Sequence, residues 1–208
     1  MLGFMGEYYV IIIPLIGGLI IGPMIYFLAR EARGHGVPEV INSMVIHGGR
    51  IWPRVAFIKA LASSICIGSG GSAGREGPII QIGSAIGSSI GQLFRFTEER
   101  TKTLVACGAA AGIAATFNAP LGGIFFALEV ILREYGLRNF SSVVLSSVTA
   151  TVISRSFLGD SPAFHLPKFE LYGILDMPFY FVFGLLTAVF AWFFLSKFCI
   201  KVKIFLIP

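Results

Sequence analysis

The segment GREGP, at residues 74–78, places two charged side chains inside an apolar stretch. Arg75 and Glu76 are the only charged residues between positions 60 and 94. Glycine before a proline is typical of a non-helical approach followed by the first turn of a new helix. Backbone N–H groups at such a helix start bind anions. A carboxylate placed there competes with the anion until it is protonated, so Glu76 is predicted to act as a gate and a proton carrier.

Two further segments show the same kind of break. They are GHGVP at residues 34–38 and NAPLGG at residues 118–123. Non-helical backbone at membrane depth is tolerated only inside protein or along a cavity. Helix starts that converge there would hold an anion without a full positive charge, which permits release as well as binding. The alternative is structural: Arg75 and Glu76 neutralise each other, and the breaks only shape the fold.

The composition indicates a polytopic membrane protein. Of the 208 residues, 55% are hydrophobic and 13% are charged, and the mean hydropathy is +0.83. Such a chain is far more apolar than a soluble domain. Charge-free runs cover residues 8–29, 103–128, 139–154 and 177–196, and about 20 apolar residues cross a bilayer. The first run follows Glu7 and lacks a basic leader, so it is expected to be a span and not a cleaved signal peptide.

The expected fold is all-α. The apolar runs are continuous and lack the alternation of membrane β-strands. Small residues at helical spacing predict helices that approach closely in lipid. The clearest examples are Gly83, Gly87, Gly91, Gly108 and Gly112. Arg30 and Arg33 follow the first run, and the positive-inside rule places them in the cytoplasm and Tyr8 outside.

Other classes of function fit the sequence poorly. The net charge of +5 lies in short connecting segments, where it sets topology, so no nucleic-acid partner is expected. Gly68, Gly70 and Ala73 match a dinucleotide-binding pattern, but no strand precedes them and no acidic residue follows at the required distance. Three cysteines stand in apolar segments without CxxC spacing, so no metal site or disulfide framework is indicated. No enzymatic activity and no cofactor are predicted.

Three stretches resemble one family of transport proteins. GREGP with the following IIQIGSAIG, the run GAAAGIAATFNAPLGGIFFALE at residues 108–129, and GHGVPEV at residues 34–40 are similar to motifs of the CLC family of chloride channels and chloride/proton antiporters. The resemblance implies a CLC-type inverted-repeat fold with broken re-entrant helices, and a homodimer with one anion pathway per subunit. It implies Glu76 as the gate. The anion-binding residues that it implies are His35, Gly36, Val37, Gly74, Arg75, Gly77 and Pro78.

Three positions bear on mechanism within this resemblance. His35 stands where many members have a serine, and its imidazole would donate an N–H to an anion and add pH sensitivity, unless the neighbouring backbone binds the anion alone. Val130 replaces the internal proton glutamate, and its neighbour Glu129 faces about 100° away on a helix. Lys59 aligns with a lysine near the pathway, where it raises the positive potential; the alternative is an interfacial side chain that reaches for water.

The chain is expected to form one membrane domain over residues 1–208, with a first-repeat portion at 8–165 and the start of a second repeat at 171–200. The anion-coordinating elements of the family's second repeat have no counterpart, so the pathway is expected to be incomplete. Because of Val130, the favoured function is a passive, voltage-gated-type chloride channel gated by Glu76. A chloride/proton antiporter and a non-transporting fragment are the alternatives. The expected partners are chloride or a similar anion, a plasma or inner membrane, and a second copy.

Overall fold

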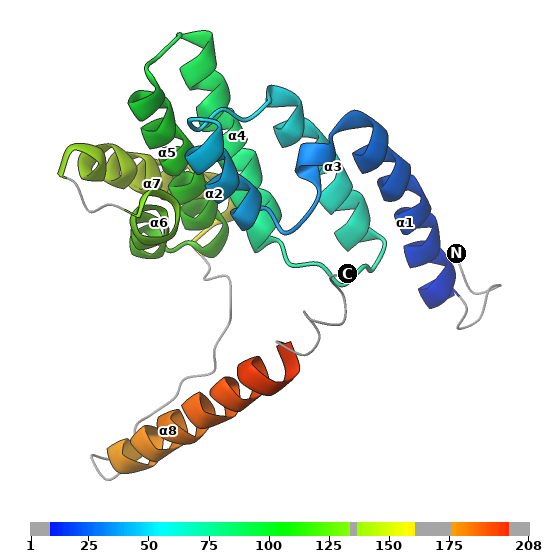
Figure 1. Cartoon of the computed structure of the whole chain (residues 1–208), viewed down its shortest axis with the longest axis vertical. Coiled ribbons are helices and arrows are strands. Elements are labelled where there is room, and N and C mark those ends of the chain that lie inside the picture. Colours follow the sequence, from blue (N-terminus) through cyan, green and yellow to red (C-terminus); the bar gives the residue numbers. More distant parts are fainter. Residues whose placement is uncertain (1–8, 134–136, 161–175, 200–208) are drawn as a thin grey trace. The chain divides into compact units, whose positions relative to one another are not determined.

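The computed structural model describes residues 9–133, 137–160 and 176–199, and every regular element in these ranges is helical (Figure 1). The chain divides into two compact units, Met1–Phe164 and His165–Pro208. The first unit contains α1 (Tyr9–Leu28), η2 (Arg30–Ala32), α2 (Val37–Ile46), α3 (Pro53–Gly68), α4 (Glu76–Leu93), α5 (Glu98–Phe117), α6 (Pro120–Phe126), η3 (Ala127–Leu132) and α7 (Leu137–Leu158). The second contains α8 (Met177–Phe194) and η5 (Leu195–Cys199). The all-α expectation is confirmed.

Helices α4 and α5 pack backbone to backbone. Gly83 of α4 lies so close to Gly108 of α5 that a Cβ on either residue would overlap the backbone of the other. Gly87 approaches the backbone of Leu104 in the same way. In these contacts the residue numbers rise along α4 as they fall along α5, so the two helices are antiparallel. The prediction that small residues let helices approach closely is confirmed.

Helix α5 forms the centre of the first unit, where it contacts α4, α6, η3 and α7. Its fully buried residues are mostly small: Val105, Ala106, Ala109, Ala110 and Ala114. Serine hydroxyl groups of α7 form hydrogen bonds to the backbone of α5 and α6. Ser147 donates to the carbonyl oxygen of Pro120 at 2.7 Å, and Ser146 donates to that of Cys107 at 2.9 Å. Each buried polar group that is paired in this way avoids the cost of losing water.

The helices stop and restart at the predicted breaks. Helix α4 begins at Glu76, and α5 ends at Phe117 before α6 begins at Pro120. Asn118 turns the chain between α5 and α6 with a φ of 54°, a left-handed conformation that asparagine tolerates better than most residues. The charge-free run 103–128 is therefore two helices and not one span.

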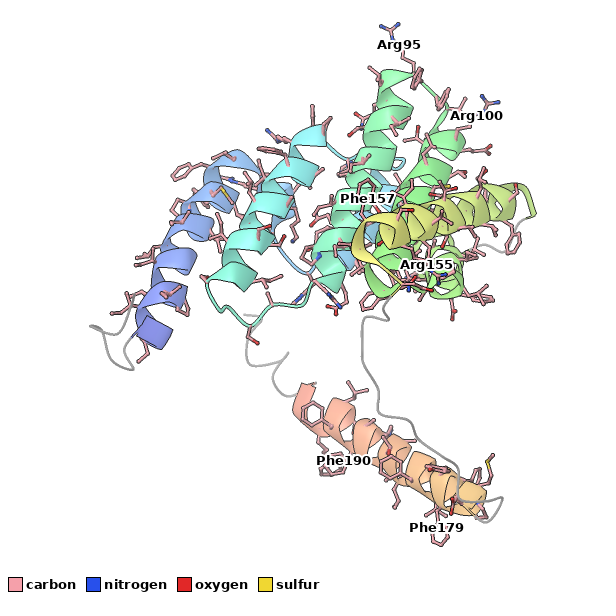
Figure 2. All side chains as sticks on the ribbon, turned by 180° about the vertical axis from the view of Figure 1, so that it is seen from behind. Arg95, Arg100, Arg155, Phe157, Phe179 and Phe190 are labelled. Carbon is pink, nitrogen blue, oxygen red and sulfur yellow. The ribbon has the colours of Figure 1, made fainter. Side chains whose placement is uncertain are left out.

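Within the part of the chain that the structure describes, three helices are long and apolar enough to cross a membrane: Ile11–Leu28, Asn139–Leu158 and Met177–Lys197. Their apolar side chains are largely exposed, as lipid-facing surfaces require. In the first unit, Figure 2 shows Phe157 on α7, Arg95 in the turn after α4 and Arg100 in the first turn of α5. The chain is a multi-pass membrane protein.

The second unit contains the long apolar helix expected near the C-terminal end. Helix α8 exposes large apolar residues along its length, including Phe179 and Phe190 (Figure 2). Residues 171–175, where the second repeat was expected to start, lie outside the described residues, as does Tyr8. The division into repeats stays a prediction.

Candidate functional site

The start of α4 carries the residues predicted as the gate. Gly74 precedes Arg75 and Glu76, and α4 begins at Glu76. The Glu76 side chain is exposed and bends back over Gly74, where an added Cβ would meet its Oε2 atom. Pro78 stands in the first turn, where its missing N–H leaves no intrahelical bond unmade. Glu76 thus lies at the positive end of a helix of 18 residues.

Arg75 points away from its acidic neighbour. Its guanidinium carbon lies 5.5 Å from the centre of the Phe117 ring, within the range of a cation–π contact. Phe117 is the last residue of α5. Arg75 therefore joins the start of α4 to the break between α5 and α6, which fits an anchoring role better than direct contact with an ion.

The start of α2 depends on two glycines. Gly34 and Gly36 have φ values of 99° and 100°, which residues with a Cβ rarely adopt. The N–H of Gly36 donates to Oε2 of Glu39 at 2.7 Å. This bond satisfies one of the N–H groups that a helix start leaves without a partner. A carboxylate of the chain itself thus occupies part of the predicted anion site.

The two predicted helix starts meet. An added Cβ on Gly36 would overlap the carbonyl of Gly77, and one on Gly77 would overlap the carbonyl of His35. Only glycine at both positions allows the loops to approach so closely. Glu76 is adjacent to this junction in the sequence, and Val37 begins α2 beside it. The structure therefore brings together His35, Gly36, Val37, Gly74, Arg75, Glu76, Gly77 and Pro78.

Lys59 holds the loop that precedes α2 through two hydrogen bonds. Its ammonium group donates to the carbonyl oxygens of Ala32 at 2.9 Å and Gly34 at 2.8 Å. The side chain is only 6% exposed, so it does not reach for water at the membrane interface. Its charge also interacts with that of Glu39. A contribution to the electrostatics of the pathway stays a prediction, alongside the structural role that these bonds give it.

Val130 lies in η3, a segment that contacts α2. It is half-buried, and the neighbouring Glu129 is exposed. The segment has the wider turn of a π-helix, a feature that is frequent at functional sites. The position aligned with the internal proton carrier thus offers no titratable group.

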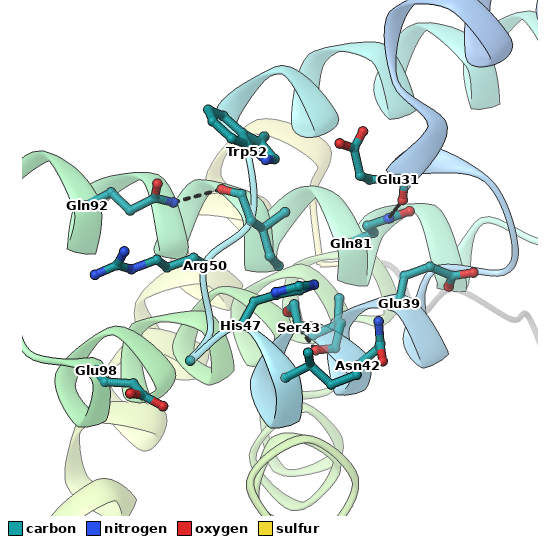
Figure 3. A pocket seen from close by; sticks show the side chains of 14 residues that line it. Glu31, Glu39, Asn42, Ser43, His47, Arg50, Trp52, Gln81, Gln92 and Glu98 are labelled. Atoms are coloured by element: carbon teal, nitrogen blue, oxygen red, sulfur yellow. Dashed lines mark hydrogen bonds between the residues drawn. The ribbon is translucent and has the colours of Figure 1, made fainter.

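A pocket of about 950 Å³ opens beside α2 and α4 (Figure 3). Its lining includes Glu31, Glu39, His47, Gln81 and Glu98. Gln81 is 2% exposed, and its Nε2 donates to the carbonyl oxygen of Glu31 at 2.9 Å. Among the described residues, its buried Oε1 atom has no hydrogen-bond partner.

Two carboxyl groups on this pocket are held in the charged form. Hydrogen bonding to its own backbone lowers the pKa of Glu31, and Arg54 at 2.8 Å lowers it further. A hydrogen bond from Lys102 lowers the pKa of Glu98, and the charge of the same lysine adds to the effect. Both carboxyl groups lie in or beside connecting segments, and the surroundings of both favour the deprotonated form.

The sequence analysis did not single out Glu39 and Gln81. Glu39 had a local signal, since it stands three residues after Gly36, the position from which a side chain reaches back to a helix start. Gln81 had a weaker one, as a large polar residue among apolar and small residues. Its isolation in the sequence does not reveal that one end of the amide is paired and the other is not.

Comparison with known proteins gives one consistent family. The family model described as voltage gated chloride channel matches residues 17–205. Over 188 residues the chain is 35% identical to the chloride channel protein CLC-e of Arabidopsis thaliana, covering 86% of this chain and 26% of the relative. Over 170 residues it is 35% identical to the H(+)/Cl(-) exchange transporter ClcA of Vibrio cholerae, covering 80% and 36%.

Comparison with solved structures indicates the same family. The crystal structure of a slow cyanobacterial Cl-/H+ antiporter matches with a TM-score of 0.73 and 30% identity, covering 89% of this chain and 45% of that one. The chain spans less than half the length of each of these relatives. Its motifs, its broken helices and these similarities agree, and the chain belongs to the voltage-gated chloride channel family, the CLC family.

Proposed function

We propose that this protein moves chloride across a membrane in exchange for protons, with Glu76 as the gate. The observation that carries the proposal is the junction of two helix starts, where Gly36 meets Gly77 beside Glu76. Converging helix N-termini attract an anion, and the adjacent carboxylate competes with that anion until it takes up a proton. Competition of this kind links the movement of the two ions.

Exchange replaces the passive channel as the favoured function. The relative from Vibrio cholerae and the cyanobacterial structure are both named for chloride/proton exchange. A passive channel is the second candidate, supported by the valine at position 130 and by the plant relative named as a chloride channel. A non-transporting fragment is the third, because the chain spans less than half of each relative. Homodimerisation stays a prediction from the family resemblance.

The test is simultaneous measurement of chloride efflux and external pH from liposomes that contain the complete gene product. Wild type is expected to take up protons as chloride leaves. Glu76→Gln removes the titratable group and keeps the shape, so we expect proton movement to be lost while chloride efflux persists at a changed rate. Chloride efflux without proton uptake in the wild type would support the channel, and no efflux would support the fragment.

Glu129→Gln is the matched comparison. Glu129 is exposed on η3 and adjoins the position aligned with the internal proton carrier. If the protons pass through Glu129 and not through Glu76, this variant will lose proton movement and Glu76→Gln will retain it. That result would contradict the role assigned to Glu76.

A further inference from the structure

The pocket beside α2 and α4 reaches the helix junction through Glu39. Glu39 lines the pocket, and its Oε2 atom accepts the N–H of Gly36. Gly36 in turn contacts Gly77, the residue after Glu76. Figure 3 shows Glu39 and Glu98 at opposite ends of the group of lining side chains. The pocket thus leads from the start of α5 to the start of α2.

The side-chain amide of Gln81 indicates which kind of molecule the pocket binds. Its Nε2 faces the carbonyl oxygen of Glu31, which fixes the orientation of the amide, because a carbonyl cannot donate to Oε1. Oε1 is therefore the atom left without a partner among the described residues, and the side chain is almost fully buried. A buried acceptor of this kind requires a donor, and leaving it unpaired is costly. A water molecule donates to it, whereas a chloride ion has no hydrogen to donate.

The charges of the lining also favour protons over anions. Glu31, Glu39 and Glu98 are on the pocket, with Arg50 and His47 between the two ends. The pKa values of Glu31 and Glu98 are lowered by their hydrogen bonds and by Arg54 and Lys102, so these two carboxylates are poor proton carriers. Glu39 differs from them in its position, because its carboxylate accepts the N–H of Gly36 at the junction and faces Lys59 of α3.

We propose that this pocket is a water-filled entry route for protons, with Gln81 holding a water molecule and Glu39 receiving the proton at the inner end. In the transfer, an O–H bond of a hydronium ion in the pocket breaks, an O–H bond forms on the Glu39 carboxylate, and the electron pair of the broken bond stays on the water. Neutral Glu39 holds the Gly36 N–H less strongly, because hydrogen bonds to charged acceptors are the stronger ones. Proton arrival thereby frees an N–H group at the junction for an anion.

This inference rests on the proposed exchange function and supplies a route that does not need a carboxylate at position 130. Its test uses the same liposomes and the complete gene product, with the ratio of protons to chloride as the readout. Glu39→Gln keeps an acceptor for Gly36 but cannot be protonated on that oxygen, and Gln81→Leu removes the water-holding amide. Each is expected to lower the proton/chloride ratio by about tenfold while chloride efflux continues, since a positioned proton carrier contributes at least that much.

Asp160→Asn is the matched control. It removes a carboxylate that does not line this pocket and that forms an ion pair with Arg155 at 3.1 Å, and it is expected to keep the wild-type ratio. Thermal melting in detergent shows whether each variant is folded, and Gln81→Leu provides a second result if Glu39→Gln proves unstable. A folded Glu39→Gln or Gln81→Leu with the wild-type ratio would overturn the proposal. Wild-type chloride efflux without protons would overturn the exchange function, and the proton route with it.

Discussion

Two carboxylates stand at two adjoining helix starts, and their surroundings differ. Glu39 accepts the N–H of Gly36 and borders the pocket, whereas Glu76 is exposed and bends over Gly74. An exposed carboxylate responds to protons in the solution that it faces, and one at the end of a pocket responds to protons that pass through it. Separate substitution of Glu39 and Glu76 therefore tests the two proposed sites of protonation independently.

Lys59 is predicted to stabilise the loop that precedes α2. Its substitution by methionine keeps the aliphatic length but leaves the carbonyl group of the buried residue Ala32 and that of the more exposed Gly34 without their donor. Each lost bond of this kind costs about 1–3 kcal/mol. We expect Lys59→Met to lower the melting temperature in detergent and to weaken chloride transport through misplacement of Gly36.

Lys102→Met is the control for that prediction. Lys102 forms an ion pair with Glu98 at 2.9 Å, and its side chain is 33% exposed against 6% for the residue Lys59. Partly exposed pairs contribute about 0–1 kcal/mol, so a much smaller change is expected. Equal losses in the two variants would contradict the loop-supporting role of Lys59.

At this scale the sequence predicts the groups that depend on local pattern. Glu76 is recognisable because it is charged in an apolar run before a helix start, and Gly36 because it precedes a proline by two residues. Lys59 was named only through its alignment with a family lysine, and Gln81 was not named, because the bonds that give both their roles come from η2 and from the loop before α2, more than twenty residues away in the chain. A side chain that is buried through distant contacts looks the same in the sequence as one that is not.

Helices α4 and α5 show what holds the elements around the site. Their closest approach is between Gly83 and Gly108, with no room for a Cβ. Gly83→Ala is expected to lower the free energy of unfolding by about 1–3 kcal/mol, because the added methyl group pushes two backbones apart. Thermal or denaturant unfolding in detergent measures the change, and loss of transport should follow if the α4 start moves.

Gly18→Ala in α1 separates this effect from helix propensity. An added Cβ on Gly18 meets nothing within 4 Å, so alanine there should be neutral or stabilising by about 0.5–1 kcal/mol. If Gly83→Ala proves no less stable than Gly18→Ala, the close approach of α4 and α5 is not what holds the pair together.

The elements themselves were predictable where glycine and proline punctuate the chain. The starts of α2, α4 and α6 follow the breaks read from the sequence. The wider turn of η3 was not, because a π-helix has no composition of its own and forms where packing favours it. Val130 lies in that segment, where the spacing of about 100° per residue in an α-helix does not hold. The face of Val130 relative to Glu129 could therefore not be predicted from the sequence.

The orientation of the first unit in the membrane follows from contacts between its connecting segments. Gly48 lies against Glu98 and Gly49 against Lys102, so the segment before α3 and the start of α5 share one side. Arg54 at the start of α3 bonds Glu31 at 2.8 Å, which adds η2 to that side. These segments carry Arg30, Arg33, Arg50, Arg54, Arg95 and Arg100. The positive-inside rule then predicts that this whole side faces the cytoplasm.

A cysteine at position 100 tests that placement in cells. In a background where Cys66, Cys107 and Cys199 are alanine, Arg100→Cys is expected to react with a membrane-impermeant maleimide only after permeabilisation, because Arg100 is exposed and lies on the side predicted to face the cytoplasm. Tyr8→Cys, before α1, is expected to react in intact cells. The reverse pattern would invert the protein and place the pocket, the proposed entry for protons, on the outer side. Reaction of both positions from one side would contradict a single crossing by α1, and with it the orientation of the gate.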